Sequence, residues 1–216
     1  MIRRVFDVIV AVVALAIVSV PLLVLAAIVK IASPGPVLFR QARVGRRGVP
    51  FALYKIRTMR CSAPGALVTA AGDDRIYPVG RWLRRWKLDE LPQFWNVLRG
   101  DMSIVGPRPE VERFVRQYRV AEQPILDSRP GLASVSALVY ANEPELLRRA
   151  SDPESTYINE LMPKKVAIDL AYEQTRTLWS DVRLLGQIAL FVAGAHSTSV
   201  VGTYAIAPDP RVNPGS

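Results

Sequence analysis

Cysteine and histidine are almost absent from this sequence, and their scarcity excludes most common catalytic sites. Cys61 and His196 are the only residues of their types among 216. A single cysteine cannot form an internal disulfide, which fits a reducing compartment, and the small residues at 62–64 indicate a loop rather than a nucleophile. A single histidine leaves almost no room for a Ser-His-Asp triad or a multi-histidine metal site. Any catalysis is therefore expected to depend on carboxylates and arginines.

Lysine is also scarce, although the chain is strongly basic. The sequence carries 28 basic and 19 acidic residues, for a net charge of +9, and only five of the basic residues are lysines. The planar guanidinium of arginine suits bidentate contacts with phosphates and carboxylates. A basic surface fits nucleic acid, the anionic face of a membrane or a plain solvated surface, and charge alone leaves these alternatives open.

Charged residues are missing from position 8 to position 29, where only Ser19 and Pro21 interrupt an apolar run. The run is long enough to cross a bilayer and longer than the apolar part of a signal peptide. Basic residues flank both ends, which a crossing helix would place on opposite sides of the membrane. Pro21 can kink the helix, and Ser19 can bind a carbonyl that the kink frees. The pattern favours a re-entrant membrane helix over residues 1–32; a crossing helix and a buried soluble helix are the alternatives.

The rest of the sequence predicts a mainly α fold with a small β-hairpin. Residues 37–43 and 51–57 resemble strands joined by a Gly-containing turn, after a break at residues 33–36. Residues 60–74 read as a loop and residues 207–216 as a disordered tail, which leaves residues 33–206 as a compact cytosolic helical domain with interfacial helices. Helices are expected over residues 79–86, 89–99, 110–121, 143–150, 162–175 and 182–193, the last of them in the core or at the membrane interface.

Two adjacent carboxylates, Asp89 and Glu90, stand at the predicted start of the 89–99 helix. As a helix cap Asp89 would contribute about 1 kcal/mol, and capping is the structural alternative. A second carboxylate adds repulsion that capping does not need and that a cation would relieve, so the pair is a candidate Mg²⁺ site. The helix N-terminus and Arg84 are expected to keep Asp89 ionised, and an ionised carboxylate can attack phosphorus.

Basic residues near these carboxylates are candidate phosphate ligands. Lys55 and Arg57 are expected on one face of the second strand, and Arg108 is held between Pro107 and Pro109 in the rigid run that ends at Glu110. A solvated strand face and a merely rigid turn are the structural alternatives. The predicted phosphate-binding set is Lys55, Arg57, Arg75, Arg84, Arg108 and Arg129. Together these features predict a membrane-bound enzyme that handles phosphorylated substrates with Mg²⁺.

Several motifs resemble, in order and spacing, those of the bacterial sugar transferases, the small monotopic phosphoglycosyl transferases. The motifs are Arg4-Val-Phe-Asp7, Gly35-Pro-Val-Leu-Phe-Arg-Gln41, Lys55-Ile-Arg-Thr-Met59, Asp74-Arg-Ile76, Gly80-Arg81, Leu88-Asp-Glu-Leu-Pro-Gln93, Asn96-Val-Leu-Arg-Gly-Asp-Met-Ser103, Val105-Gly-Pro-Arg-Pro-Glu110 and Arg129-Pro-Gly131.

The resemblance implies transfer of sugar 1-phosphate from a UDP-sugar to undecaprenyl or another polyprenyl phosphate, with release of UMP, at the start of surface glycan assembly. It implies Asp89 as the nucleophile, Glu90 as a support for Mg²⁺ binding and catalysis, Arg84 as a phosphate contact, and Pro107 and Pro109 as part of the active site. It also implies a re-entrant helix, broken at an adjacent Ser-Pro pair, in the bacterial inner membrane with the domain facing the cytoplasm. This sequence departs from that pair, because the serine is displaced by one residue in Ser19-Val-Pro21. The expected partners are these substrates and the bilayer, not nucleic acid; the oligomeric state is left open.

The sequence departs from many family members after Gly131. Residues 132–143 resemble instead a branch with an Asn-Glu pair, here Asn142-Glu143, and a Leu-Met-Pro-Lys-Lys run, here Leu161-Met-Pro-Lys-Lys165. The region is expected to bear on the sugar or the nucleotide, so the sugar is not assigned. Three other functions stay open: a non-catalytic membrane-anchored binder, a scaffold of the same family, and a glycosyltransferase that releases UDP.

Overall fold

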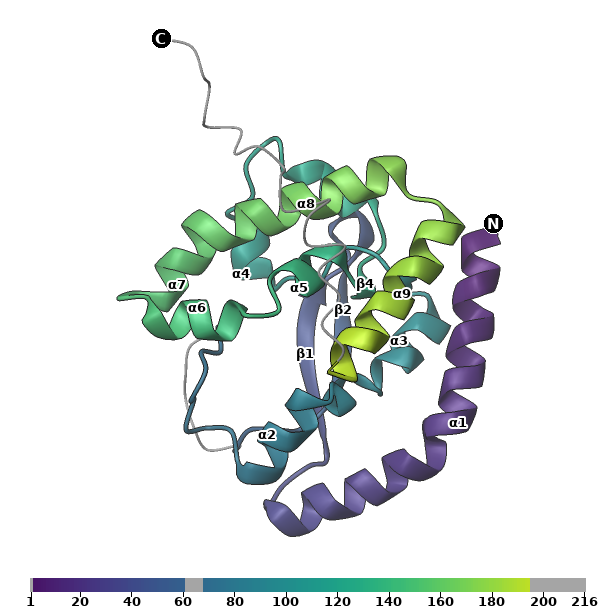
Figure 1. The fold of residues 1–216 in the computed structure, drawn as a ribbon, viewed down its shortest axis with the longest axis vertical. Coiled ribbons are helices and arrows are strands. Elements are labelled where there is room, and N and C mark those ends of the chain that lie inside the picture. Colours follow the sequence, from purple (N-terminus) through teal and green to yellow (C-terminus); the bar gives the residue numbers. More distant parts are fainter. Residues whose placement is uncertain (1, 61–67, 195–216) are drawn as a thin grey trace.

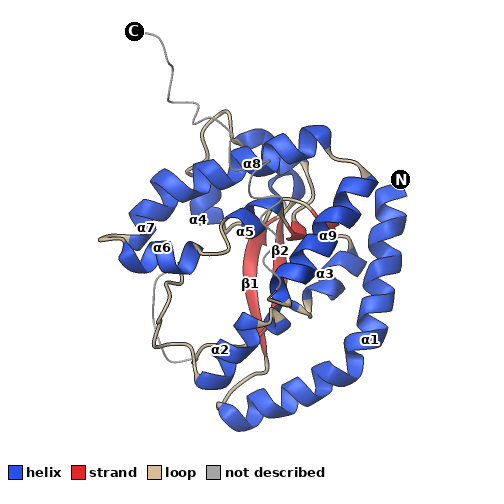
Figure 2. Cartoon of the chain, in the orientation of Figure 1, coloured by secondary structure: helices blue, strands red, loops and turns tan. Residues whose placement is uncertain are grey.

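The computed structural model describes residues 2–60 and 68–194 and confirms a mainly helical chain around a small β-hairpin (Figures 1 and 2). Cys61, His196 and the predicted tail at 207–216 lie outside the described residues. The helices are α1 (Ile2–Ala32), α2 (Pro78–Arg85), α3 (Gln93–Arg99), α4 (Glu112–Val115), α5 (Val135–Val139), α6 (Glu143–Arg149), α7 (Pro153–Thr156), α8 (Met162–Thr175) and α9 (Leu178–Val192). Short 3-10 turns cover Arg46–Gly48, Leu88–Glu90 and Gln123–Asp127, and a π-helical turn, Tyr157–Leu161, leads into α8.

The hairpin formed by β1 (Leu38–Val44) and β2 (Pro50–Ile56) is confirmed. The strands are antiparallel, with Leu38 opposite Ile56 and Val44 opposite Pro50. The connecting turn needs a left-handed backbone, and Gly48 supplies it with φ of 76°. Leu53 and Ile56 of β2 are buried, so the hairpin forms the centre around which the helices pack (Figure 1).

A second, parallel sheet was not predicted. It pairs β3 (Ser103–Val105) with β4 (Gly131–Ala133). Strands of three residues carry too little alternation to be recognised in sequence. Glycines permit the segment after β3 to pack closely against the start of β4. A Cβ on Gly106 would lie 2.4 Å from the Arg129 carbonyl oxygen, and the Gly131 N–H donates to the Pro107 carbonyl at 2.8 Å. The sheet thus brings the turn at Arg129 against the segment that contains Arg108.

The expected helices at 79–86, 143–150 and 162–175 are confirmed as α2, α6 and α8. The expected 89–99 helix was too long at its start, because α3 begins only at Gln93; its end at Arg99 is confirmed, where Gly100 stops the helix with φ of 91°. The expected 110–121 helix was largely wrong: α4 is a single turn, because the Glu110 carbonyl accepts from the Val44 N–H of β1 and the Glu122 carboxylate binds the Arg119 N–H in a turn.

The last helix, α9, begins before the expected residue 182. The Thr177 side chain accepts from the Ser180 N–H, and the Ser180 side chain accepts from the Thr177 N–H, which is a capping box. The box starts the helix at Leu178 and carries the exposed Trp179 onto its first turn. An aromatic side chain at such a position suits a water–membrane interface.

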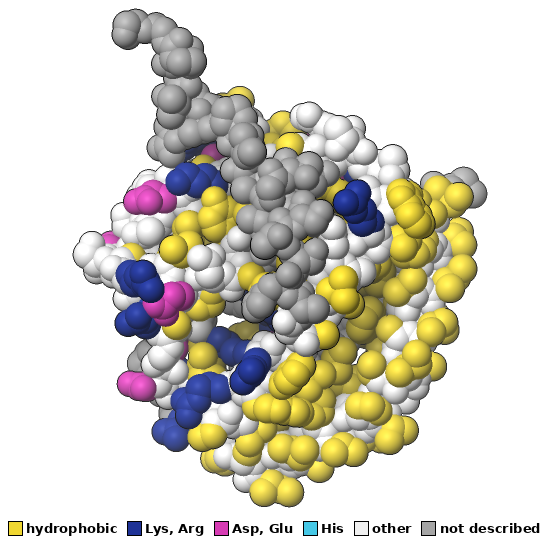
Figure 3. Space-filling view, viewed as in Figure 1, with side chains coloured by type: hydrophobic (Ala, Val, Ile, Leu, Met, Phe, Trp, Pro, Cys, Tyr) yellow, Lys and Arg dark blue, Asp and Glu magenta, His cyan; other side chains and the backbone are white. Residues whose placement is uncertain are grey.

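The N-terminal helix α1 is long and apolar and bends partway along its length (Figure 1). Pro21 lies inside it, and the Ser19 hydroxyl donates to the Ala16 carbonyl at 2.9 Å. Its outer face is lined with exposed aliphatic side chains (Figure 3). Among the described residues, α1 is the one helix that is long and apolar enough to cross a membrane.

Both ends of α1 are tied to the rest of the domain. Near its start, Arg4 donates to the Val97 carbonyl at 2.6 Å. Just beyond its end, the Ser33 carbonyl accepts from Arg57 at 2.7 Å. In the first half of the helix Ala11 is buried against α3 and β3, and near its C-terminal end Val29 is buried against the hairpin and α2.

Asp7 of α1 provides a stability prediction. Its buried carboxylate accepts from the Ser103 hydroxyl and the Ile104 N–H, each at 2.9 Å. Asp7→Ala leaves both donors without a partner, so the free energy of unfolding should fall by about 2–4 kcal/mol. Thermal unfolding in detergent measures the loss. Ser19→Ala, which removes only an exposed hydroxyl bonded within α1, is the control, and an equal effect of both variants would contradict the prediction.

Candidate active site

The carboxylate pair lies in the 3-10 turn between α2 and α3. Lys87 precedes the turn in a left-handed conformation with φ of 55°, which is rare for a side chain other than glycine and reverses the chain after α2. Asp89 and Glu90 are 6% and 9% exposed. Asp89 does not cap α3, whose N-cap residue is Pro92 without a side-chain cap. Simple capping therefore does not explain why two acidic side chains are buried here.

Glu90 is held by two basic residues from different parts of the chain. Lys55 Nζ at the end of β2 lies 3.2 Å from Glu90 Oε1, and Arg108 Nη2 lies 2.5 Å from the same oxygen. Burial alone would raise the pKa of Glu90, but Arg108 and Lys55 hold it well below its usual range. Glu90 in turn raises the pKa of Arg108. Glu90 and Arg108 are thus a charged pair at neutral pH, whereas burial lowers the pKa of Lys55 beside them.

Asp89 has a different environment from its neighbour. Its Oδ1 is buried and has no hydrogen-bond partner among the described residues. Burial and then the Glu90 charge raise the pKa of Asp89, against the smaller opposing effects of Lys55 and Arg84. We expected Arg84 and a helix N-terminus to keep Asp89 ionised. Arg84 does act in that direction, but burial and Glu90 outweigh it, and Asp89 does not cap α3. A carboxylate with a raised pKa is more basic, and so more nucleophilic, once it is ionised.

The other predicted phosphate ligands divide into two groups. Arg84 Nε donates to the Thr58 hydroxyl at 2.8 Å and acts electrostatically on Asp89, so Lys55, Arg84 and Arg108 surround the pair. Elsewhere, Arg57 donates to the Ser33 and Pro34 carbonyls, and Arg75 pairs with Asp73 in its own loop at 2.5 Å. Arg129 contributes its main chain to the segment packed on Gly106.

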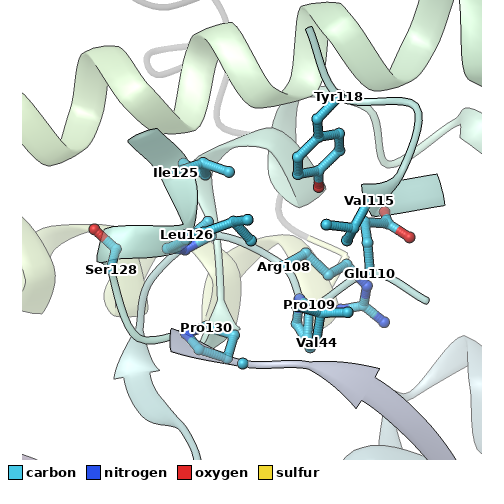
Figure 4. A pocket seen from close by; sticks show the side chains of 12 residues that line it. Val44, Arg108, Pro109, Glu110, Val115, Tyr118, Ile125, Leu126, Ser128 and Pro130 are labelled. Carbon is cyan, nitrogen blue, oxygen red and sulfur yellow. The ribbon is translucent and has the colours of Figure 1, made fainter. Parts of the chain in front are cut away.

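Pro107, Arg108 and Pro109 form a loop, the 107–109 loop, that is fixed from behind. Arg43 donates to the Pro109 carbonyl at 3.0 Å and to the Glu110 carboxylate at 3.4 Å, and the Tyr157 hydroxyl donates to Glu110. The loop borders a small hollow, into which Tyr118 points (Figure 4). In this arrangement Glu110 anchors the loop.

Several residues that complete this region were not among the predicted site residues, although Glu143 and Lys165 lie in motifs that were expected to bear on the sugar or the nucleotide. Lys165 pairs with Glu143 at 2.6 Å and donates to the Tyr157 hydroxyl at 3.4 Å, so the Asn-Glu and Lys-Lys motifs of the divergent segment meet in space. The amide of Gln93, which is 2% exposed, has a buried Nε2 without a hydrogen-bond partner among the described residues. Helical periodicity assigns such positions to the core, and it gives no sign that a polar side chain is needed there.

The donor set of the pair suits a loosely held cation. No group of three His, Cys, Asp or Glu side chains able to bind a metal occurs within residues 2–60 and 68–194. Mg²⁺ in phosphate-handling sites is commonly held by one or two carboxylates, with substrate phosphates and water as the other ligands. The unpartnered oxygen of Asp89 beside Glu90 fits that pattern.

Comparisons with known proteins agree with this chemistry. The model of the bacterial sugar transferase family matches residues 1–194. The chain is 43% identical to a UDP-glucose:undecaprenyl-phosphate glucose-1-phosphate transferase of Caulobacter vibrioides, over 85% of the chain and 66% of that protein.

Two further relatives cover a smaller share of their own length. A UDP-N-acetylgalactosamine-undecaprenyl-phosphate N-acetylgalactosaminephosphotransferase of Aeromonas hydrophila is 37% identical over 85% of the chain and 42% of that protein. A UDP-glucose:undecaprenyl-phosphate glucose-1-phosphate transferase of Escherichia coli is 36% identical over 86% of the chain and 39% of that protein. The chain thus spans less than two thirds of each of these relatives. With the family model matching nearly its whole length, the chain belongs to the bacterial sugar transferase family.

Proposed function

We propose that this chain moves sugar 1-phosphate from a UDP-sugar to undecaprenyl phosphate, releases UMP, and so starts the assembly of a surface glycan. The family and the reactions named for its relatives support the substrate classes. The observation that carries the proposal is the asymmetry of the pair: Glu90 is bound by Lys55 and Arg108, whereas Asp89 keeps a buried oxygen without a partner among the described residues. That oxygen is free to form a bond.

In the proposed first displacement, the Asp89 carboxylate attacks the phosphorus that bears the sugar. A bond forms between Asp89 and that phosphorus, the bond to the bridging diphosphate oxygen breaks, and UMP leaves with that oxygen and its electron pair. In the second, a phosphate oxygen of the lipid attacks the same phosphorus. The bond to Asp89 breaks, the carboxylate is regenerated, and a polyprenyl-diphosphate-linked sugar is formed.

The basic residues of the site would stabilise the charge that these displacements carry. Lys55, Arg84 and Arg108 place positive groups around the pair before any substrate enters, and preorganised charge is worth most in a buried site. Mg²⁺ held by Asp89 and Glu90 would further offset the charge of the diphosphate and of UMP. Arg108 also keeps Glu90 from repelling an incoming phosphate.

We propose further that α1 is re-entrant in the bacterial cytoplasmic membrane and that the domain faces the cytoplasm. The bend, the exposed aliphatic face and the attachment of both helix ends to one domain support this placement (Figures 1 and 3). Such a helix would hold the site at the depth of the lipid headgroups, where the acceptor phosphate lies. Helix α9, with Trp179 exposed, would lie at the interface.

The experiment that tests this function is UMP release by the purified protein from a panel of UDP-sugars, with Mg²⁺ and undecaprenyl phosphate in detergent or nanodiscs. UMP together with a lipid-linked sugar phosphate is the expected result, and the preferred donor would identify the sugar. UDP as the nucleotide product would indicate a glycosyltransferase instead. If UDP-sugars bind but no nucleotide is released, the chain acts as a non-catalytic scaffold.

A further inference from the structure

A second buried carboxylate, Asp169 of α8, lies behind the 107–109 loop. It is 5% exposed, and Asp169, Ser136 and Arg108 line one small hollow. Asp169 Oδ1 accepts from the Ser136 N–H at 3.0 Å, and Oδ2 accepts from the Ser136 hydroxyl at 2.7 Å. Pro107, Arg108 and Glu110 line the same hollow, so this carboxylate faces the 107–109 loop. Asp169 is thus the point where the loop meets α5 and α8.

Ser136 is itself held rigidly. It lies in the first turn of α5, which Ser134 caps by accepting from the Ala137 N–H at 3.1 Å. The Ser134 and Ser136 hydroxyls lie 3.3 Å apart. Ser136 belongs to the segment in which this sequence departs from many family members, so that segment lines the hollow behind the 107–109 loop.

We propose that Asp169 and Ser136 are positioning residues that hold the main chain of the 107–109 loop, so that Arg108 keeps its contact with Glu90. Two hydrogen bonds from Ser136 fix Asp169, Asp169 faces the loop across their shared hollow, and the Arg108 side chain reaches Glu90 at 2.5 Å. The two prolines limit how far the loop can rearrange if this anchor is lost. The expected changes in the rate of UMP release rest on the proposed function, whereas the expected change in hydrogen exchange of the loop does not.

The charge of Asp169 makes the proposal testable by pH. Burial raises its pKa to about 6, against the effects of the Ser136 bonds, Lys165 and the Arg108 N–H. The protonated carboxyl has lost one acceptor position, so its hold on the loop weakens below that pH. The other titratable groups that line the hollow or pair with its lining are Arg108, Glu110, Tyr118, Glu143, Tyr157 and Lys165.

Asp169→Asn imitates the protonated carboxyl at every pH. Its kcat/KM for UMP release, divided by that of the wild type, should approach one near about pH 5 and fall about tenfold or more near about pH 8. Asp89 also titrates, but its effect is common to both proteins and cancels in this ratio. Ser136→Ala removes a bond that lowers the pKa of Asp169, so its loss of activity on acidification should begin at a higher pH than in the wild type.

Hydrogen exchange tests the same inference without any turnover. In a peptide that covers residues 106–110, the two prolines carry no amide hydrogen, and the Gly106 N–H is bonded to the Ala133 carbonyl at 3.0 Å. Faster exchange in Asp169→Asn would therefore fall mainly on Arg108 and Glu110. The matched control is Asp181→Asn, a buried carboxylate whose partners, Tyr172 and Arg176, do not line the hollow. Its link to this region is the bond from Arg176 to the Val105 carbonyl at 2.8 Å, which leaves the amide hydrogens of residues 106–110 unbonded by it.

The two measurements separate the possible failures. Faster exchange at residues 106–110 in Asp169→Asn but not in Asp181→Asn supports the positioning role even if no UDP-sugar is turned over, in which case only the proposed function fails. Unchanged exchange at residues 106–110, or an activity ratio that is independent of pH and equal to that of Asp181→Asn, overturns the role.

Discussion

Asp89→Asn should abolish turnover without weakening the fold. An amide cannot form the proposed acyl phosphate bond, so UMP release should fall by at least about 10⁴-fold, as when other enzymes lose their nucleophile. The wild type incubated with a UDP-sugar but no lipid acceptor should release UMP in proportion to enzyme and gain a sugar phosphate on the peptide that contains Asp89. The variant should show neither the burst nor the adduct.

Asp89→Asn should also be at least as stable as the wild type. Burial and Glu90 raise the pKa of Asp89, so the folded protein binds this proton more tightly than the unfolded chain does. Above the raised pKa the buried charge therefore destabilises the fold, and the neutral amide that Asp89→Asn introduces removes that penalty. The free energy of unfolding near neutral pH should be unchanged or higher than in the wild type, as is common when a functional group is removed.

Glu112→Gln is a suitable control for Asp89→Asn, because Glu112 is an exposed carboxylate paired with Arg116 on the solvent side of α4. It should keep wild-type turnover. Turnover of Asp89→Asn close to that of the wild type would remove Asp89 from the role of nucleophile. Loss of turnover together with a clear drop in stability would indicate instead that Asp89 supports the fold.

The parts of the fold that sequence reasoning predicted share a strong local signal. The hairpin has alternating strands and a glycine turn, α8 has helical spacing over a long window, and Gly100 ends α3 in the left-handed conformation that favours glycine. The parallel pair of β3 and β4 has no such signal, because it depends on Gly106 and Gly131 meeting across a gap in the sequence.

In the candidate site, too, sequence predicts the features with a local signal and misses those that depend on tertiary packing. Adjacent carboxylates and an arginine between prolines are visible in sequence, and Glu90 with Arg108 proves to be one cluster. Sequence cannot give the sign of the Asp89 pKa shift, because the shift depends on burial and not on the neighbouring arginine alone. Nor could it find Asp169, whose place behind the 107–109 loop depends on how α8 packs.

Glu90→Gln should impair both chemistry and stability, in contrast to Asp89→Asn. The change leaves Lys55 and Arg108 beside a neutral amide, and uncompensated buried charge costs about 3–5 kcal/mol of unfolding free energy. Turnover should fall about 10²–10³-fold, because the electrostatic arrangement around the transferred phosphorus is lost. Denaturant unfolding and UMP release measure the two effects.

The pH dependence of this variant has a definite sign. Burial lowers the pKa of Lys55, so the folded state binds that proton less tightly than the unfolded chain does. Stability attributable to Lys55 therefore rises with pH as the ammonium deprotonates. Since Glu90 opposes this shift in the wild type, Glu90→Gln should gain more stability than the wild type between neutral and alkaline pH.

A double variant separates the structural contribution of Glu90 from the catalytic one. Glu90→Gln combined with Lys55→Met replaces one half of the charged cluster with neutral groups of similar size, which often restores stability when a buried ion pair is removed as a unit. Turnover should stay low, because neither substitution returns a carboxylate beside Asp89 or a cation beside the phosphates. Recovery of turnover along with stability would show that Glu90 acts only by supporting the fold, and the assignment of the pair as a catalytic unit would then reduce to Asp89 alone.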